Sequence, residues 1–132
     1  MKKVLDELFA LRDEGYRAFT AKLTPSLDEE SIIGVRTPAL RAYARRFSKE
    51  ADAHAFLDEL PHRYYEENNL HSALISLLFK DIDSAMSQVE RFLPYVDNWA
   101  TCDALAPKLF KRHTDIVYPK ITEWITSANL TV

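Results

Sequence analysis

The stretch YYEENNLHSALISLLFK, residues 64–80, decides the fold, because it predicts one long helix at the centre of the molecule. Its second half, from Ala73 to Phe79, is apolar on all sides apart from Ser76. A helix that is apolar all round is typical of one packed between other helices, whereas a surface helix keeps a polar face. We therefore expect this helix to be central and others to pack around it.

Helical spacing of apolar residues, together with helix-ending signals, predicts further helices on both sides of this stretch. The first is expected over residues 2–22. The next follows a turn at Gly34, with Thr37 as N-cap and Pro38 at the first helical position, and runs to about Ser48. The remaining helices are expected to begin at Asp52 (closed by Pro61), at Asp83 or Ser84 (closed by Pro94), at Asp97 or Asn98, and at Thr114.

This succession of short helices with short connections contains no convincing strand and predicts an all-α fold. Helices of this kind pair antiparallel, as in a bundle or an α-solenoid. A degenerate HEAT-like solenoid, with one helix pair about every 40 residues, is compatible with the pattern. Periodicity alone leads no further than helical pairs.

Composition limits the class of protein. The 132 residues with 47% hydrophobic content are enough for one compact domain over residues 1–132. No run of 18 apolar residues is present, so we expect no membrane span, and the acidic residues in MKKVLDELFALRDEG argue against a signal peptide. The single cysteine, Cys102, excludes an intrachain disulfide, and a cytoplasmic protein is expected. The ending EWITSANLTV stops where a new helix would begin, and predicts a fragment truncated at its C-terminus.

Charge is segregated along the chain although the net charge is only -3. Between residues 34 and 49 there are five basic residues and no acidic one: Arg36, Arg41, Arg45, Arg46 and Lys49. Residues 50–67 hold six acidic residues against one arginine, and a second basic cluster of Lys108, Lys111 and Arg112 lies further on. Solvated helix faces explain any single charge best. Two basic clusters separated by an acidic one also fit a molecule with one positive surface.

Metal and nucleophile chemistry find little support. Glu67 and His71 are four residues apart, with His62 nearby, but a stable metal site needs a third ligand, and no metal is expected. Polar residues that satisfy one another beside a helix pair explain this trio better. Asp103 adjoins Cys102 and would raise the thiol pKa, which is the opposite of activation. No glycine-rich phosphate loop is present, and no cofactor is expected.

The stretch VDNWATCDALAPKLF, residues 96–110, holds the best candidate for chemistry. Trp99 and Asp103 are four residues apart, so they lie on one face of the helix expected there. Asp97 is accounted for as a cap, but Asp103 sits mid-helix, where aspartate is a poor helix former and the N-terminal dipole no longer helps it. The pair is either a core tryptophan beside a solvated carboxylate or a site, and the residues alone leave both open.

Two motifs carry a family resemblance. GVRTPALRAYAR at residues 34–45, followed some sixty residues later by YVDNWATCDALAP at residues 95–107, resembles the DNA alkylation repair family of HEAT-like alkylpurine DNA glycosylases. The resemblance runs from about Leu23 to Ile125 in motif order and helix succession. It implies a HEAT-like α-solenoid, a superhelix of antiparallel helix pairs, whose concave basic face holds duplex DNA. The segment YYEENNLH departs from the family pattern because it is more acidic and polar.

The resemblance also implies roles for particular residues. Trp99 and Asp103 correspond to a family pair that lines the DNA groove, with Asp103 stabilising the oxocarbenium-like sugar and Trp99 packing beside it. The implied DNA-binding residues are Arg36, Thr37, Arg41, Arg45, Lys108 and Lys111. The expected activity is hydrolysis of the N-glycosidic bond of cationic N3- or N7-alkylated purines in duplex DNA, without metal, cofactor or obligate protein partner. The alternative is a non-catalytic HEAT-like module that binds nucleic acid or protein on its concave face.

Overall fold

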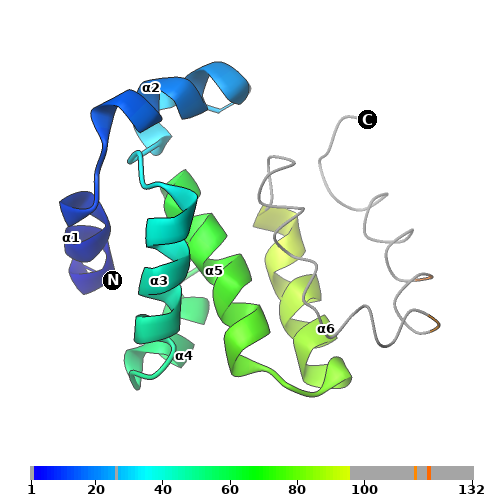
Figure 1. Ribbon diagram of the computed structural model, residues 1–132. Coiled ribbons are helices and arrows are strands. Elements are labelled where there is room, and N and C mark those ends of the chain that lie inside the picture. Colours follow the sequence, from blue (N-terminus) through cyan, green and yellow to red (C-terminus); the bar gives the residue numbers. More distant parts are fainter. Residues whose placement is uncertain (1, 26, 96–114, 116–118, 120–132) are drawn as a thin grey trace.

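The computed structural model describes residues 2–25 and 27–95, together with Asp115 and Pro119 (Figure 1). Its helices are α1 (Lys2–Ala10), α2 (Glu14–Leu23), α3 (Thr37–Phe47), α4 (Asp52–Leu57), α5 (Tyr65–Leu78) and α6 (Ile82–Phe92), with short 3-10 helices η1 (Glu29–Ser31) and η2 (Leu93–Tyr95). No strand occurs in this part of the chain, so the expected all-α class is confirmed for it. No helix in the described ranges has the length and apolar character needed to cross a membrane.

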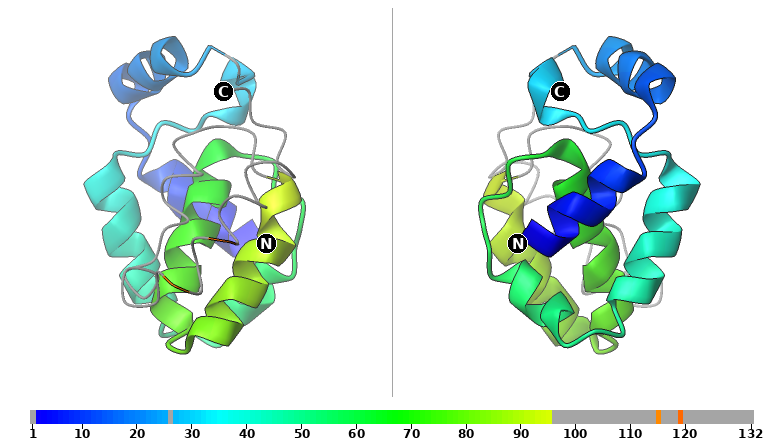
Figure 2. Two further views of the ribbon diagram at one scale, coloured as in Figure 1. Left: turned by 90° about the vertical axis from the view of Figure 1, so that its right-hand side faces the viewer. Right: turned by 90° about the vertical axis from the view of Figure 1, so that its left-hand side faces the viewer.

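Helix α5 is the centre of the described structure, as its sequence predicts. It packs against α3 on one side, α6 on the other and the short α4. Figures 1 and 2 show that α3 and α5 run in the same direction, whereas α6 returns antiparallel to α5. Helix α1 lies on the side of α3 away from α6, and α2 lies across the N-terminal end of α3. The α5–α6 pair is therefore the antiparallel unit that the short connection between them predicts.

The hydrophobic core lies where α1, α3, α4 and α5 meet. Phe47 at the end of α3 is fully buried; its ring stacks on Tyr43 with centroids 5.7 Å apart and meets Phe56 of α4 edge-on at 6.0 Å. The other buried members of this cluster are Val4, Leu8, Ile33, Val35, Leu40, Ala44, Ala53, Leu57, Leu70 and Leu74. Because α1 contributes Val4 and Leu8 to the same cluster, it is part of the domain core.

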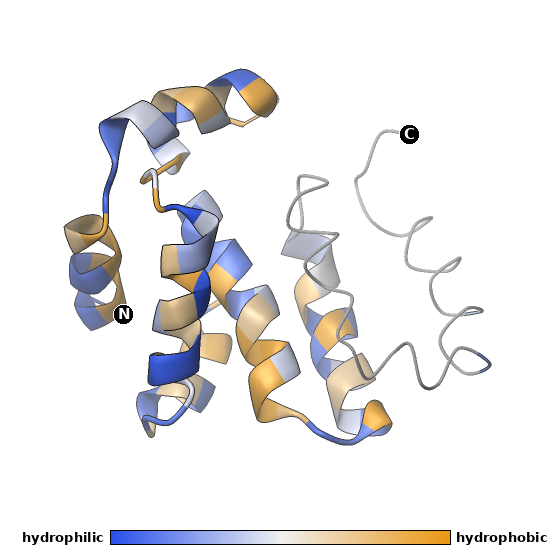
Figure 3. Ribbon diagram, in the orientation of Figure 1, coloured by the Kyte–Doolittle hydropathy of each residue, from blue (hydrophilic) through white to orange (hydrophobic). Residues whose placement is uncertain are grey.

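The most buried part of α5 is its polar first half, which corrects the sequence-based expectation. Glu66 is 1% exposed, and Glu67, Asn68 and His71 are also buried. Figure 3 shows that the hydrophilic end of α5 is the one beside the start of α3, while the more apolar end reaches the loop into α6. Leu77 and its neighbours there are only partly buried. Apolar periodicity identifies the central helix correctly, but hydropathy cannot show which polar groups find buried partners.

Several predicted helix boundaries are wrong, and each error has a local cause. The helix expected over residues 2–22 is two helices, because the Asp13 carboxylate caps a new start by accepting a hydrogen bond from the Tyr16 N–H. Thr37 is the first residue of α3, so Arg36 holds the N-cap position and makes no side-chain cap. The Ser84 N–H donates to Asp81, which therefore caps α6 in place of the expected Asp83 or Ser84.

Candidate nucleic-acid interface

The turn at residues 32–36, which leads into α3, is held by a buried carboxylate. Gly34 has φ +98°, a left-handed conformation that favours glycine. The Glu66 carboxylate accepts three backbone N–H groups in succession, from Ile33 at 2.8 Å, Gly34 at 2.9 Å and Val35 at 3.2 Å. A buried charge is tolerated when it is fully hydrogen-bonded, and this arrangement meets that condition.

Helix α2 holds the other side of the same turn. The Asp13 N–H donates to the Gly34 carbonyl at 2.8 Å, and Arg17 Nε donates to the Ile32 carbonyl at 2.9 Å. A second nitrogen of Arg17 donates to the Glu29 carbonyl at 2.9 Å. Backbone N–H groups of the turn therefore bond to Glu66, and two of its carbonyl groups accept from Arg17 and the Asp13 N–H. Buried backbone groups need such partners, and these partners hold the turn in one conformation.

Arg36 and Thr37, two of the predicted DNA-binding residues, lie at the exit of this turn beside α2. The Arg36 side chain is 61% exposed, its Nε donates to Asp13 Oδ2 at 3.0 Å, and its guanidinium lies 5.3 Å from the centre of the Tyr16 ring. The Tyr16 N–H and then Arg36 lower the pKa of Asp13, so the carboxylate is charged at neutral pH. Thr37 Oγ1 lies 3.3 Å from the Tyr16 hydroxyl. Asp13 therefore offsets part of the positive charge of Arg36.

Arg41 and Arg45 differ from Arg36 in having no such partner. Both are exposed on α3, and their side chains make no ion pair or hydrogen bond with any residue in the described ranges. Thr37, Arg41 and Arg45 follow one another at four-residue spacing, so they lie on one helical face, about 6 Å apart along the axis. We call these three residues the basic face of α3. Its two charges are the ones that a phosphate backbone could neutralise.

The other predicted site residues cannot be placed against this face. Trp99, Asp103, Lys108 and Lys111 lie outside the described residues. Of the site predicted from the sequence, the structure therefore places Arg36 and Thr37 at the N-terminal end of α3, and Arg41 and Arg45 along its exposed side.

The histidines considered for metal binding form a pair in which His71 is buried and His62 is partly buried. His62 Nε2 and His71 Nδ1 lie 2.9 Å apart, with His62 stacked on Phe56 and His71 stacked on Phe92. Burial lowers the pKa of His62 to about 4 and that of His71 to about 3, so both rings are neutral at pH 7. The described residues hold no group of three potential ligands. The two histidines satisfy one another, as the alternative interpretation expects, whereas Glu67 bonds elsewhere.

Glu67, the third residue of that trio, has its own partner. Its carboxylate accepts a hydrogen bond from the Tyr64 N–H at 3.0 Å and so closes a capping box at the start of α5. Burial raises the pKa of Glu67, an effect that the Tyr64 hydrogen bond partly offsets. Glu67 therefore caps the start of α5, whereas its neighbour Glu66 bonds the turn before α3.

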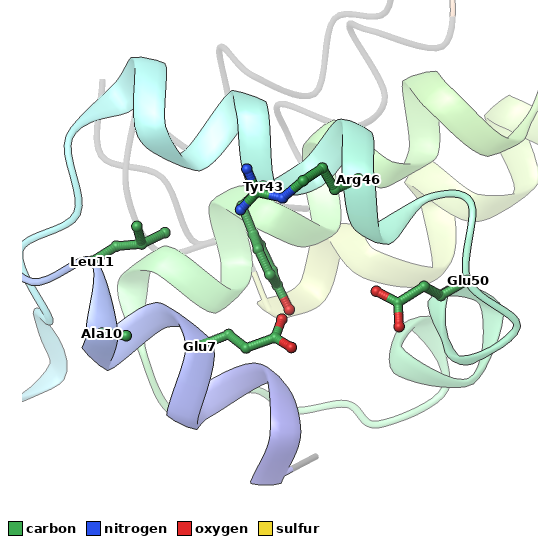
Figure 4. Close-up of a pocket in the computed structure, with 6 residues that line it drawn as sticks. All are labelled: Glu7, Ala10, Leu11, Tyr43, Arg46 and Glu50. Atoms are coloured by element: carbon green, nitrogen blue, oxygen red, sulfur yellow. The ribbon is translucent and has the colours of Figure 1, made fainter.

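A crevice of about 380 Å³ lies on the opposite side of α3, between that helix and α1 (Figure 4). The Tyr43 hydroxyl points toward the Glu7 carboxylate, and Arg46 lies over the Tyr43 ring, 5.8 Å from its centre. Burial and then Glu7 raise the pKa of Tyr43, so the phenol keeps its proton. Glu50 also lines the crevice and pairs with Lys3. The two carboxylates, Glu7 and Glu50, make this crevice a poor surface for nucleic acid. Arg46 lies beside them and over the Tyr43 ring, so it does not belong to the basic face.

The sequence-based site missed the residues that shape the turn: Asp13, Tyr16, Arg17 and Glu66. A signal for Glu66 was present, because a glutamate in the first turn of a helix expected to be central must find a partner. A signal for Asp13 was present too, since aspartate is a preferred N-cap residue. No signal in the sequence indicates that both groups act on the same turn, because the contact between Gly34 and Glu66 spans 32 residues.

Comparisons with known proteins give one finding. The sequence model of a family described as DNA alkylation repair enzyme matches residues 4–132. No curated protein and no solved structure matches the chain. The match covers nearly the whole sequence and includes the turn, the basic face of α3 and the stretch around Trp99 and Asp103.

Proposed function

The chain belongs to the DNA alkylation repair family, and from this premise we propose that it is a DNA glycosylase. The reaction is hydrolysis of the N-glycosidic bond of cationic N3- or N7-alkylated purines in duplex DNA. Membership in a family of DNA alkylation repair enzymes assigns the chain to that process and makes DNA its substrate. The glycosidic reaction and the residues that perform it are our proposal.

The observation that carries the proposal is the basic face of α3. Arg41 and Arg45 are exposed and without ion pairs among the described residues, one helical turn apart beside Thr37. The phosphates of one DNA strand are spaced about 3.4 Å along the helix axis, so two arginines about 6 Å apart can each meet a different phosphate. Such contacts fix the register of a protein on duplex DNA without reading its sequence. This is the requirement for an enzyme that recognises damage in any sequence context.

The chemistry is assigned to Asp103 and Trp99, in the matched part of the chain outside the described residues. A purine alkylated at N3 or N7 is cationic and leaves as a neutral base, so its departure needs no general acid. The sugar that remains gains positive charge. A carboxylate about 4 Å from it supplies about 4 kcal/mol of attraction at an effective dielectric constant near 20, or about a thousandfold in rate if the attraction arises only in the transition state. The Trp99 face adds a cation–π attraction of about 0.5 to 2 kcal/mol.

The architecture proposed for this function is a HEAT-like α-solenoid with the basic face of α3 on its concave side. The parallel α3 and α5 and the antiparallel α5–α6 pair are compatible with successive helix pairs that each bury one face on the next. Lys108 and Lys111 are proposed to extend the same positive surface. A concave surface of this kind lets several helix pairs contact one stretch of duplex.

The binding part of the proposal is tested by salt dependence. Affinity for duplex DNA should fall steeply with salt concentration, and Arg41→Ala should lower the slope of log K against log salt by about one unit, because one phosphate contact is lost. Arg46→Ala is the matched control, since it removes the same charge from the opposite side of α3. Equal salt slopes for Arg41→Ala and the unchanged protein would show that the basic face of α3 does not contact DNA.

The catalytic part is tested by base release under single-turnover conditions. Asp103→Asn keeps the size of the side chain but removes its charge, so excision of methylated purines should fall by orders of magnitude while DNA binding is retained. Equal excision rates for both proteins would contradict the assignment of Asp103. Salt-dependent DNA binding with no base release by the unchanged protein would favour the non-catalytic binding module.

A further inference from the structure

We propose that Glu66 is a positioning residue for DNA binding: its buried carboxylate holds the turn at residues 32–36, and the turn in turn places Arg36, Thr37 and the first turn of α3 against the DNA backbone. This inference rests on the proposed function. It assigns a role to a side chain that is 1% exposed and lies on a different helix from the residues that would contact DNA.

The geometry around Glu66 is that of an anion site filled from within the protein. Three successive backbone N–H groups, from Ile33, Gly34 and Val35, converge on its two carboxylate oxygens at 2.8 to 3.2 Å. Successive N–H groups around a residue with positive φ form the concave arrangement that binds phosphate in other proteins. Here the carboxylate of α5 occupies that position, so these three amides are not offered to DNA.

The fixed turn has a direct connection to the proposed interface. Val35 is followed at once by Arg36 and Thr37, and the Arg36 carbonyl accepts the Leu40 N–H at 2.9 Å as the first hydrogen bond into α3. The direction in which α3 begins is therefore set by the same few residues that Glu66 holds. A carboxylate on the central helix serves this purpose well because charge-assisted hydrogen bonds are short and directional.

Because Glu66 carries a carboxylate, the direction in which its neutralisation changes DNA affinity tests the proposal. Removing a negative charge from a DNA-binding protein should, by electrostatics alone, leave affinity unchanged or raise it slightly. If Glu66 acts through the turn, its neutralisation should instead weaken binding. The adjacent Glu67 is a matched control, because it is also buried in the first turn of α5 but bonds the Tyr64 N–H and not the turn.

The experiment compares Glu66→Gln with Glu67→Gln in the full chain, by affinity for a labelled DNA duplex at a temperature where circular dichroism shows each protein folded. Glu66→Gln should bind the DNA duplex about tenfold more weakly. Removing the hydrogen-bond partner that orients a metal ligand weakens metal binding on a similar scale. Glu66→Gln should also speed amide hydrogen exchange at residues 33–35 without DNA. Glu67→Gln should bind within about twofold of the unchanged protein, since the two removed charges are equivalent at long range. Equal affinities for the two variants would overturn the proposal.

A milder variant keeps the proposal testable if Glu66→Gln does not fold. Glu66→Asp retains the charge but is one methylene shorter, so it cannot reach all three N–H groups. Its affinity for DNA should fall by more than the twofold allowed for Glu67→Gln but by less than tenfold. Unchanged affinity in Glu66→Asp, together with faster exchange at residues 33–35, would show that the turn does not position the interface. Arg41→Ala separates the two hypotheses: if it fails to weaken DNA binding, the proposed interface is wrong, whereas a normal Arg41→Ala effect with no Glu66 effect removes only the positioning role.

Discussion

The two ends of the α3–α5 pair are held together by different interactions. At the N-terminal end, the Glu66 carboxylate accepts hydrogen bonds from the turn before α3, and Arg17 Nε and the Asp13 N–H donate hydrogen bonds to it. At the C-terminal end of α3, Phe47 packs edge-on against Phe56 of α4 within the apolar core cluster. The polar end is the one beside Arg36 and Thr37, which are proposed to contact DNA.

This difference follows from what each kind of interaction can do. Hydrophobic burial is non-directional and contributes most of the stability of a domain, so it suits the end where only close packing is needed. Hydrogen bonds contribute less net free energy, but their geometry is narrow and they fix atoms in place. We therefore expect substitutions at the apolar end to change stability alone, and substitutions at the polar end to change DNA binding as well.

The largest effect is expected at the apolar end. Phe47→Ala removes a fully buried ring and leaves a cavity between α3 and α4, so it should lower the free energy of unfolding by about 3–5 kcal/mol. Urea denaturation measures this loss. The salt slope of DNA binding by the remaining folded protein should be unchanged, and a changed slope would contradict the separation of the two ends. Lys49→Ala, at an exposed position just beyond α3, is the control and should stay within about 0.5 kcal/mol.

The next effect is expected at the polar end. Gly34→Ala places a side chain on a residue with φ +98°, and its Cβ would lie 2.6 Å from Arg17 Cβ and 2.8 Å from the Asp13 carbonyl oxygen. Backbone strain and overpacking together should cost about 2–4 kcal/mol in unfolding free energy. Weaker DNA binding should accompany this loss, unlike Phe47→Ala.

The other glycine of the chain is the matched control. Gly15 lies in the first turn of α2, and an added Cβ would meet only Asp13 Oδ1 at 3.4 Å, an ordinary contact. Gly15→Ala should be neutral or stabilising by up to about 1 kcal/mol, because alanine is the better helix former. Equal losses in Gly15→Ala and Gly34→Ala would contradict the special role of the turn.

A smaller effect is expected from acid, because two histidines, His71 in α5 and His62 just before it, are uncharged in the folded protein. His62 and His71 are neutral in the fold, with pKa values of about 4 and about 3, whereas the unfolded chain takes up protons below about pH 6.5. The unfolded state then binds more protons, so stability is lost as pH falls through this window. Between pH 7 and pH 5.5 the two histidines together should cost about 2 kcal/mol, measured by urea denaturation at both values.

The double variant His62→Gln and His71→Gln isolates this contribution and should lose much less stability over the same interval. Asp13 and Asp81 do not interfere, since hydrogen bonds from the Tyr16 and Ser84 N–H groups lower their pKa values and place their titration below this window. Glu67 acts with the opposite sign because burial raises its pKa. An unchanged pH dependence in the double variant would show that the histidine pair does not stay neutral in the fold.

The smallest effect is expected at the Asp13–Arg36 pair. Asp13→Asn keeps a side chain that can cap α2 but releases Arg36 from its ion pair, so DNA affinity should rise by about threefold and the salt slope should steepen by up to one unit. Glu14→Gln is the control, because Glu14 pairs with Arg12 and does not touch the turn. A weaker affinity in Asp13→Asn would indicate that the pair holds Arg36 in its binding position and does not merely offset its charge.

The described fold was largely predictable from local patterns. The central helix at residues 65–78, the glycine turn at Gly34 and the start of α3 near Pro38 follow from hydrophobic period, positive φ and helix-start chemistry, all of which act over a few residues. The division of residues 2–22 at Asp13 was missed, because a continuous apolar period over that segment outweighed one capping residue. Local signals of similar strength compete there, and contacts with the turn decide between them.

The sequence by itself determined the all-α class of the described part of the chain, its central helix, the segregated basic stretch at residues 34–49 and membership in a DNA alkylation repair family. Only the tertiary structure decided which charged side chains are buried, which are paired and which remain exposed. It buried Glu66 against the turn before α3, paired Arg36 with Asp13, separated Arg46 onto the α1 side and left Arg41 and Arg45 exposed. Hydropathy treats these charged groups as equivalent. The free energy of burying each one depends on the hydrogen-bond partners that distant segments supply, and those partners are in place only after the helices have packed.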